Sequence, residues 1–339
     1  MTRVAAIDCG TNSIRLLIAD VEADGSMHEI DRRMTIVRLG EGVDATGRFS
    51  DAALARTFAA CEEFANVIGA HSVERIRFVA TSASRDVSNR DEYVAGVKAR
   101  LSVEPDVISG DEEARLSFLG ATSGLAAGVA GPYLVLDIGG GSTEFVFGTE
   151  TPERAKSVNI GCVRMTERHL NADPVSAEAI ADAVIDIDAA IAVAAAEVPI
   201  GEAATVIGLA GSVTTVAAMA IGLERYDRKA IHGSVISKDA VHRVSERLLK
   251  MTREQRAALP FMHPGRVDVI GAGSLVLDRI MQHVPNASVL VSEHDILDAG
   301  HDLDQVEGLE EQAVARAEEV RPGGTRDVAA GRRFDLDHV

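Results

Sequence analysis

YLVLDIGGGSTEFVFG, residues 133–148, carries the pattern on which the rest of the chain is built. Two apolar runs of strand length flank three consecutive glycines, Gly139, Gly140 and Gly141, and this predicts a β-hairpin. Glycines let a turn adopt positive φ angles and bring its N–H groups close to an anion, most often phosphate. Asp137 would repel phosphate unless a divalent cation lies between them, and Mg²⁺ binds one or two carboxylates together with phosphate oxygens. A tight hairpin with a solvated aspartate is the plainer alternative.

The N-terminal stretch VAAIDCGTNSIRLLIADV, residues 4–21, repeats this pattern. Its Asp, Gly and Ser have the same spacing as those of the first stretch: Asp8, Gly10 and Ser13 against Asp137, Gly139 and Ser142. Each stretch is followed by a helical segment (51–68 and 176–197), an apolar strand (76–80 and 204–209) and a polar turn (TSASR, 81–85, and AGSVTT, 210–215). Because the elements follow in the same order after both stretches, we predict a duplicated α/β domain whose two anion-binding turns face each other across a cleft.

The composition is that of a globular protein of two-domain size: 339 residues, of which 46% are hydrophobic. A net charge of −18 and the absence of Trp argue against nucleic-acid and anionic-membrane partners. Cys9, Cys61 and Cys162 are far apart, which predicts buried thiols in a reducing compartment without a zinc site or disulfides. No apolar run reaches the roughly 18 residues of a membrane span. Asp8 interrupts the N-terminal run too early for a signal peptide, so we expect a cytoplasmic protein.

The glycine-rich stretch GLAAGVAG, residues 124–131, predicts the crossover between two domains. We expect domain I over residues 1–128 and domain II over 129–299, with 300–312 packing back on domain I. Residues 313–339 are charged and poor in large apolar side chains, which predicts a disordered tail.

Domain II shows two further local patterns. Residues 238–251 predict a helix, and VDVIGAGSLVLDRIM, residues 267–281, predicts a short strand joined to a helix across a Gly-x-Gly turn. The latter pattern serves helix packing more often than ligand binding.

VISGDEEARLSFLGA, residues 107–121, predicts a helix that begins with a capping box between Ser109 and Glu112. Glu113 has no capping duty and is free to face a cleft, although a solvated acid in the first turn is the plainer alternative. Arg85 suits bidentate phosphate binding but is equally typical of a surface. His232 is interpreted as an ordinary loop residue.

Several known site patterns are missing. The SEHD stretch, residues 292–295, has no facing partner at helical spacing and is not interpreted as a metal site. No Gly-Lys dipeptide is present, which excludes a Walker A loop, and neither H-E-x-x-H nor G-x-S-x-G occurs.

Taken together, these segments resemble the exopolyphosphatase and guanosine pentaphosphate phosphohydrolase (Ppx/GppA) family. The resemblance rests on AAIDCGTNSIRLLI, TSASRD, ISGDEEARLSFLG, LVLDIGGGSTEF, GLAGSVTT, RVDVIGAGSLVL and VSEHDILDAG, from Val4 to about Gly300. It implies two duplicated ribonuclease H-like domains of the actin, Hsp70 and sugar kinase superfamily, with the active site in the interdomain cleft. It also implies a hydrolase that depends on Mg²⁺ or another divalent cation and removes the terminal phosphate from inorganic polyphosphate or pppGpp.

Carried over residue by residue, the resemblance assigns catalytic roles to Glu113 as the base, to Asp137, and to Glu144, which helps to position metal or water. The implied metal ligands are Asp8, Asp137 and Glu144. The implied phosphate ligands are Thr11, Asn12, Ser13, Arg15, Arg85, Gly139, Gly140, Gly141, Ser142 and Thr143.

The favoured hypothesis is an exopolyphosphatase that releases orthophosphate. Long family members add a C-terminal HD-like domain that helps to hold polymer, and its absence predicts a preference for shorter chains. The net acidity must be offset locally by Mg²⁺ and a cluster of arginines: Arg15, Arg85, Arg90 and Arg115. A homodimer is the family expectation.

Three alternatives stay open. They are a pppGpp phosphohydrolase, a nucleotide-dependent phosphotransferase of the same superfamily, because GLAGSVTT lies where kinases bind adenosine, and a non-catalytic sensor. Glu113 and Asp137 disfavour the sensor, because a pure binder needs no general base.

Overall fold

The computed structural model describes residues 1–22, 26–85, 87–126 and 128–299, all of which belong to one unit of the chain. The predicted packing segment 300–312 and the predicted tail 313–339 lie outside the described residues. None of the helices in the described ranges combines the length and the apolar character needed to span a bilayer.

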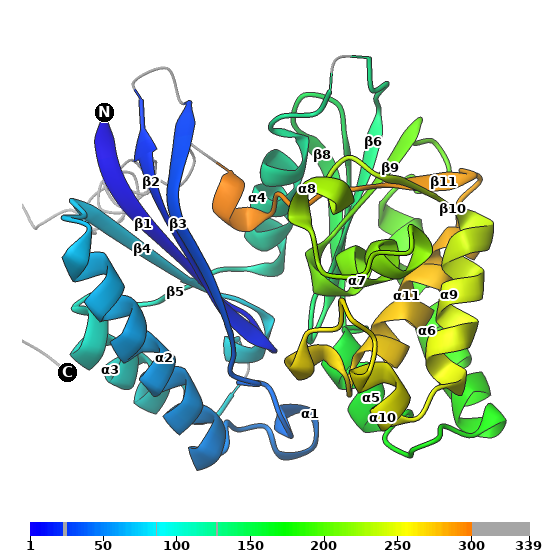
Figure 1. Ribbon diagram of the computed structural model, residues 1–339, viewed down its shortest axis with the longest axis horizontal. Coiled ribbons are helices and arrows are strands. Elements are labelled where there is room, and N and C mark those ends of the chain that lie inside the picture. Colours follow the sequence, from blue (N-terminus) through cyan, green and yellow to red (C-terminus); the bar gives the residue numbers. More distant parts are fainter. Residues whose placement is uncertain (23–25, 86, 127, 300–339) are drawn as a thin grey trace, which may run out of the picture. The chain divides into compact units, whose positions relative to one another are not determined.

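The first sheet consists of β1 (Thr2–Cys9), β2 (Ser13–Val21), β3 (Met27–Ile36), β4 (Arg75–Ala80) and β5 (Asp106–Val107). Its strand order is β3-β2-β1-β4-β5 (Figure 1). β1 and β2 form the predicted antiparallel hairpin, with Asp8 opposite Arg15, and β4 runs parallel to β1. Helices α2 (Asp51–Ala70) and α3 (Arg90–Leu101) cover one face, where Phe64, Phe78 and Tyr93 share a buried core.

The second sheet consists of β6 (Tyr133–Ile138), β7 (Thr143–Gly148), β8 (Pro152–Val158), β9 (Thr205–Leu209), β10 (Val235–Ser237) and β11 (Ser288–Val291). Its order is β10-β11-β9-β6-β7-β8. The helices of this part are α5 (Cys162–Arg168), α6 (Ala177–Glu197), α7 (Ala210–Ala220), α8 (Arg228–Ile231), α9 (Lys238–Lys250), α10 (Arg253–Ala257) and α11 (Ile270–His283). Leu136 and Phe145 share a buried core with Ile187, Val216 and Leu277, which joins this sheet to α6, α7 and α11.

The two sheets repeat one arrangement, as the duplicated pattern predicts. In the first sheet, the hairpin strand β2 pairs with antiparallel β3, and the hairpin strand β1 pairs with parallel β4. In the second sheet, β7 pairs with antiparallel β8 and β6 pairs with parallel β9 in the same way. The expected helices at 51–68, 176–197 and 238–251 are also confirmed, as α2, α6 and α9. Strand periodicity and turn composition are local signals, which is why both hairpins can be predicted from the sequence.

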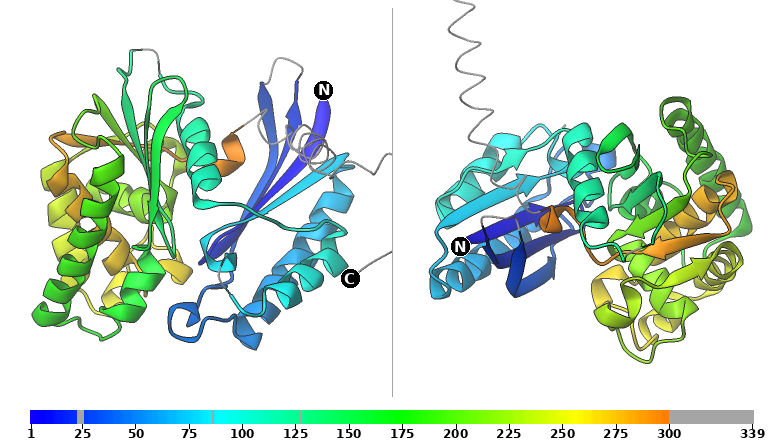
Figure 2. Two further views of the ribbon diagram at one scale, coloured as in Figure 1. Left: turned by 180° about the vertical axis from the view of Figure 1, so that it is seen from behind. Right: turned by 90° about the horizontal axis from the view of Figure 1, so that it is seen from above.

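Helix α4 (Gly110–Thr122) lies between the two sheets. Leu116 belongs to a buried cluster with Ala6 and Val79 of the first sheet, whereas Phe118 belongs to one with Val135 and Val146 of the second. Figures 1 and 2 show α4 beside the strands of the second sheet and next to η3 (Ile296–Asp298). A residue on α4 can therefore act on groups from both sheets.

Three local predictions are wrong. The predicted polar turn AGSVTT is the first part of α7, and the predicted strand and Gly-x-Gly turn at 267–273 give way to α11, which begins at Ile270. Packing explains the glycines of α11, because a Cβ on Gly273 would lie 2.2 Å from the hydroxyl of Ser212. The capping box is only half formed, since Ser109 accepts from the backbone of Glu112 but the Glu112 carboxylate binds Arg77 instead.

Three short segments complete the described chain. They are α1 (Val43–Thr46) and the 3₁₀ turns η1 (Ser82–Ser84) and η2 (Pro264–Arg266). η1 follows β4 directly, at the carboxyl end of that strand.

Candidate active site

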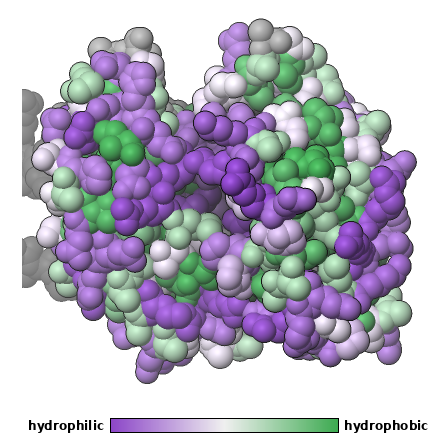
Figure 3. Space-filling model, in the orientation of Figure 1, coloured by the Kyte–Doolittle hydropathy of each residue, from purple (hydrophilic) through white to green (hydrophobic). Residues whose placement is uncertain are grey.

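One pocket collects residues from both hairpin turns, from α4 and from the start of α7. It encloses about 860 Å³, part of it open solvent. Figure 3 shows mostly hydrophilic residues around the hollow at the centre of that face of the molecule. The predicted site residues on its lining are Asp8, Thr11, Asn12, Ser13, Arg15, Glu113, Asp137, Gly139, Gly140, Gly141 and Ser142.

The first turn presents backbone donors to the pocket. Gly10 N–H donates to the carbonyl of Ser13 at 2.9 Å and closes the turn. The carbonyls of Thr11 and Asn12 accept from the backbone that follows β3, including Gly40 N–H at 2.9 Å. These hydrogen bonds to the carbonyls fix the backbone of the turn. The N–H groups of Thr11 and Asn12 make no hydrogen bond to any described residue, so they are free to bind an anion.

The second turn has the same construction. Gly139 N–H donates to the carbonyl of Ser142 at 3.0 Å, and the carbonyls of Gly139 and Gly140 accept from the first N–H groups of α5. The guanidinium of Arg164 donates to the carbonyl of Gly141 at 2.8 Å. Gly140 and Gly141 N–H make no hydrogen bond within the described part of the chain, so this turn also offers free donors.

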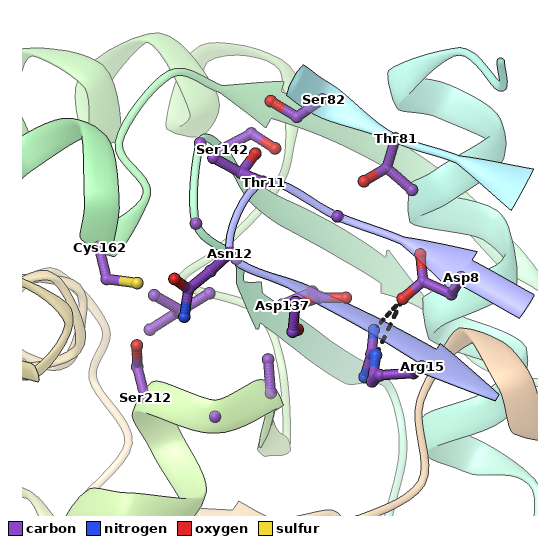
Figure 4. Close-up of a pocket in the computed structure, with 18 of the residues that line it drawn as sticks. Asp8, Thr11, Asn12, Arg15, Thr81, Ser82, Asp137, Ser142, Cys162 and Ser212 are labelled. Carbon is purple, nitrogen blue, oxygen red and sulfur yellow. Dashed lines mark hydrogen bonds and ion pairs between the residues drawn. The ribbon is translucent and has the colours of Figure 1, made fainter. Parts of the chain in front are cut away.

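The tips of the two turns touch each other. A Cβ on Gly140 would lie 2.8 Å from Thr11 Cβ, and one on Gly141 would lie 2.7 Å from the hydroxyls of Thr11 and Ser82. The glycines are therefore needed for this approach. It brings the free donors of both turns to one place, as Figure 4 shows for Thr11 and Ser142.

Asp8 and Arg15 form an ion pair next to the turn of the first hairpin. Arg15 Nε donates to Asp8 Oδ2 at 2.9 Å (Figure 4), and Arg15 also pairs with Asp295. Burial raises the pKa of Asp8 above its ordinary value, although the Arg15 guanidinium opposes this. Arg15 lines the pocket but is held by two carboxylates, which neutralise much of the charge expected for a phosphate ligand.

Asp137 and Glu144 are opposite each other in the second hairpin. Ser117 Oγ donates to Asp137 Oδ2 at 2.7 Å, while Ser142 Oγ and Ser157 Oγ each donate to Glu144 Oε1 at 2.7 Å. Burial raises the pKa of Asp137 to about 6, and burial together with the Asp137 carboxylate raises that of Glu144 to about 7. The serine hydroxyls oppose both shifts because they stabilise the charged forms.

Glu113 points from the first turn of α4 into the pocket, as the sequence predicts. Burial and then the carboxylate of Glu144 raise its pKa well above the ordinary value. Arg85 donates to Glu113 and, through Nε, to the carbonyl of Ile108 at 3.1 Å. Arg85 therefore binds the expected base and is not itself part of the pocket lining.

Two further predicted phosphate and metal ligands lie off the lining. Thr143 donates its hydroxyl to the carbonyl of Ile160 at 2.8 Å, and Glu144 is fully buried. The lining also contains residues that were not predicted: Thr81, Ser82, Ser117, Cys162, Ser212 and Arg266. Thr81, Ser82 and Ser212 could have been found from the polar stretches that follow β4 and β9, whereas Ser117, Cys162 and Arg266 carry no such signal.

The carboxylates fit a divalent cation bound jointly with substrate. Within the described ranges no three His, Cys, Asp or Glu side chains are arranged to hold a metal ion by themselves. However, Asp8 Oδ1 and Glu144 Oε2 are buried without a hydrogen-bond partner among the described residues, as are Thr11 Oγ1 and Asn12 Oδ1. Unpartnered buried oxygens are costly, and Mg²⁺ needs only one or two carboxylates when phosphates and waters complete its shell.

Comparison with known proteins identifies the family. The Ppx/GppA phosphatase family matches residues 17–296. Exopolyphosphatase 2 of Mycobacterium tuberculosis (strain H37Rv) is 47% identical over 310 residues, which cover 88% of this chain and 97% of that protein.

Solved structures show the same fold. The crystal structure of an exopolyphosphatase-like protein has a TM-score of 0.85 at 44% identity and covers 88% of this chain and 97% of its own. The Aquifex aeolicus member of the Ppx/GppA family has a TM-score of 0.73 at 28% identity, with 91% and 98% covered. With the two mixed sheets, these neighbours show the two-domain actin-like α/β fold that the resemblance implied.

Proposed function

The chain belongs to the Ppx/GppA phosphatase family, and from this premise we propose that it is an exopolyphosphatase that hydrolyses the terminal phosphoanhydride of inorganic polyphosphate. The observation that carries the proposal is the meeting of two turns with free N–H donors beside Glu113 and Asp137. Phosphoryl transfer needs charge neutralisation and a positioned water more than covalent chemistry from the protein. This pocket offers both.

Binding of the terminal phosphate falls to the backbone donors of the two turns. Hydrogen bonds to the carbonyls of both turns preorganise the free N–H groups, which are those of Thr11, Asn12, Gly140 and Gly141. These donors therefore need no rearrangement to bind phosphate oxygens. Asp8 and Asp137, which line the pocket, would hold Mg²⁺. Glu144 lies opposite Asp137 in the β6–β7 pair, off the pocket lining. When bound, the cation neutralises charge on the phosphate oxygens.

Glu113 is the proposed general base. It lies on the lining, and burial raises its pKa, which makes its carboxylate a stronger base than an exposed one. Arg85 forms an ion pair with this carboxylate. A phosphate that draws the Arg85 guanidinium toward itself would leave Glu113 free to accept the proton.

Short polyphosphates are the proposed substrates. The net charge of −18 repels a long polyanion, and two of the arginines expected to bind phosphate are already paired with carboxylates: Arg15 with Asp8 and Asp295, and Arg85 with Glu113. Arg266 lines the pocket and contacts Thr215, so it is the arginine with room for one phosphate of a short chain. We also propose domains over 1–128 and 129–299, a cytoplasmic location and a homodimer, which limited proteolysis, cell fractionation and light scattering can test.

Phosphate release by the purified protein tests the proposal. Short polyphosphate, long polyphosphate, pppGpp and ATP are offered side by side with Mg²⁺. Glu113→Gln should lower kcat on short polyphosphate by about 10²- to 10⁴-fold, the usual contribution of a general base. Asp111→Asn, an exposed acid in the same turn of α4, is the matched control and should keep full activity.

The substrate comparison separates the alternatives. Release from pppGpp alone would make the protein a nucleotide phosphohydrolase, and transfer from ATP to an acceptor would make it a phosphotransferase. Equal turnover of long and short polymers would overturn the length preference.

A further inference from the structure

Two buried carboxylates of the second hairpin are each held through one oxygen by serine hydroxyls. Asp137 Oδ2 accepts from Ser117 at 2.7 Å, and the Ser117 side chain is completely buried. Glu144 Oε1 accepts from Ser142 and Ser157, both at 2.7 Å. Each carboxylate therefore keeps its second oxygen for another partner.

The second oxygen of Glu144 has no partner in the described structure. Glu144 Oε2 is buried and makes no hydrogen bond to any described residue, although a buried carboxylate oxygen normally finds one. Asp137 lies directly opposite Glu144 across the β6–β7 pair, so both side chains point to the same face of the sheet. Two like charges on one face, each with an oxygen left over, favour a cation.

Ser117 and Ser157 come from elements outside the phosphate turns. Ser117 lies one helical turn after Glu113 on α4, so the same helix provides the proposed base and the hydroxyl that holds Asp137. Ser157 lies on β8 and approaches the start of α4. Gly110 permits this approach, because a Cβ on Gly110 would lie 3.0 Å from Ser157 Cβ.

A serine hydroxyl constrains a carboxylate because it must lie near the plane of the acceptor group. Fixing one oxygen in this way fixes the direction of the other. Partners that hold metal ligands typically contribute 10- to 100-fold to metal affinity.

We propose that Ser117 and Ser157 are positioning residues, which hold Asp137 and Glu144 so that one oxygen of each stays available to a divalent cation or its bound water. The inference rests on the proposed function, because it concerns the cation used in that hydrolysis. Ser142 also donates to Glu144, but it belongs to the second phosphate turn and was already expected to bind phosphate.

The test measures Mn²⁺ binding in the presence of inorganic phosphate, whose oxygens complete the shell of the cation, by the electron paramagnetic resonance signal of the free ion. Ser117→Ala and Ser157→Ala should each bind Mn²⁺ about 10- to 100-fold more weakly than the wild type. Ser157→Thr keeps a hydroxyl and should restore most of the affinity. Ser245→Ala is the matched control, since Ser245 is buried on α9 and its hydroxyl has no partner among the described residues.

Steady-state kinetics on short polyphosphate provide the second measurement. At saturating Mg²⁺, the alanine variants should recover most of kcat, whereas at low Mg²⁺ they should fall well below the wild type. A merely structural role would lower the melting temperature and kcat together at every Mg²⁺ concentration.

The outcomes separate this inference from the proposed function. Unchanged Mn²⁺ affinity in both folded alanine variants would overturn it, as would a wild type that binds no Mn²⁺. The expected order of affinities without release from any polyphosphate would leave the positioning role standing and refute the exopolyphosphatase. If Ser117→Ala does not fold, the Ser157→Ala and Ser157→Thr pair decides alone.

Discussion

Gly161 is outside the pocket lining, yet its replacement by alanine should disable the second phosphate turn. It precedes α5 with φ −91°, a value that alanine adopts without strain. A Cβ at this position would lie 2.3 Å from the carbonyl carbon and oxygen of Gly140 and 2.4 Å from the nitrogen of Gly141. Ordinary contacts begin near 3.4 Å, so these backbone atoms must move by about 1 Å.

A displacement of this size has a large predicted effect on catalysis. Misplacing reacting groups by 1 Å costs about 10²-fold in rate, or about 2.7 kcal/mol of transition-state stabilisation. Overpacking should lower the free energy of unfolding by about 1–3 kcal/mol, which leaves the protein folded at 25 °C if it has ordinary stability. The expected result for Gly161→Ala is therefore a folded protein with kcat/KM about 100-fold lower on short polyphosphate.

The assay compares phosphate release and melting temperature for the wild type, Gly161→Ala and Gly201→Ala. Gly201 is the control, because a Cβ there would have nothing within 4 Å. Wild-type kcat/KM in Gly161→Ala would refute the argument that the backbone of the second turn must lie where it does. A loss of activity that tracks unfolding would refute it as well.

Two pH-dependent predictions follow from the charged groups. Burial and Asp137 raise the pKa of Glu144 from 4.5 to about 7, so its contribution to stability is present below about 4.5 and is lost as pH rises through 7. The melting temperature of Glu144→Gln in a chelator should accordingly fall less between pH 5 and 8 than that of the wild type. Hydrogen bonds from Arg168, and then the charges of Arg164 and Arg168, lower the pKa of Asp44, so its stabilisation is present above pH 3.8 and is lost as pH falls further. Asp44→Asn should cost about 1 kcal/mol at pH 7, measured by urea unfolding, and equal stabilities at pH 7 would contradict this.

Local patterns were enough to predict both hairpins and the Asp, Gly and Ser residues with which their turns line the pocket. The Asp, Gly and Ser of each turn follow from the spacing of strands and turn residues within one short segment. Their neighbours in the chain decide that conformation, so a sequence pattern can indicate it. The same holds for Glu113, whose place in the first turn of a capped helix is a local property.

Local reasoning failed where packing overrides turn composition. Gly271 and Gly273 look like a turn in the sequence but lie inside α11, and Gly273 is needed there because the helix approaches Ser212 closely. Likewise, the polar residues that follow β9 predict a loop, yet they begin α7.

By itself, the sequence determined two hairpins of equal design, their glycine-rich turns and the acid on the capped helix, since each depends on residues close together in the chain. Only the tertiary structure decided the partners of the charged groups. Arg85 binds Glu113, and Ser117 and Ser157 hold Asp137 and Glu144 from different elements. Those pairs join residues 13 to 28 positions apart. The placement of α4 between the two sheets brings Glu113 and Ser117 to their partners, and the register of β7 and β8 places Ser157 opposite Glu144. No short-range pattern encodes either arrangement.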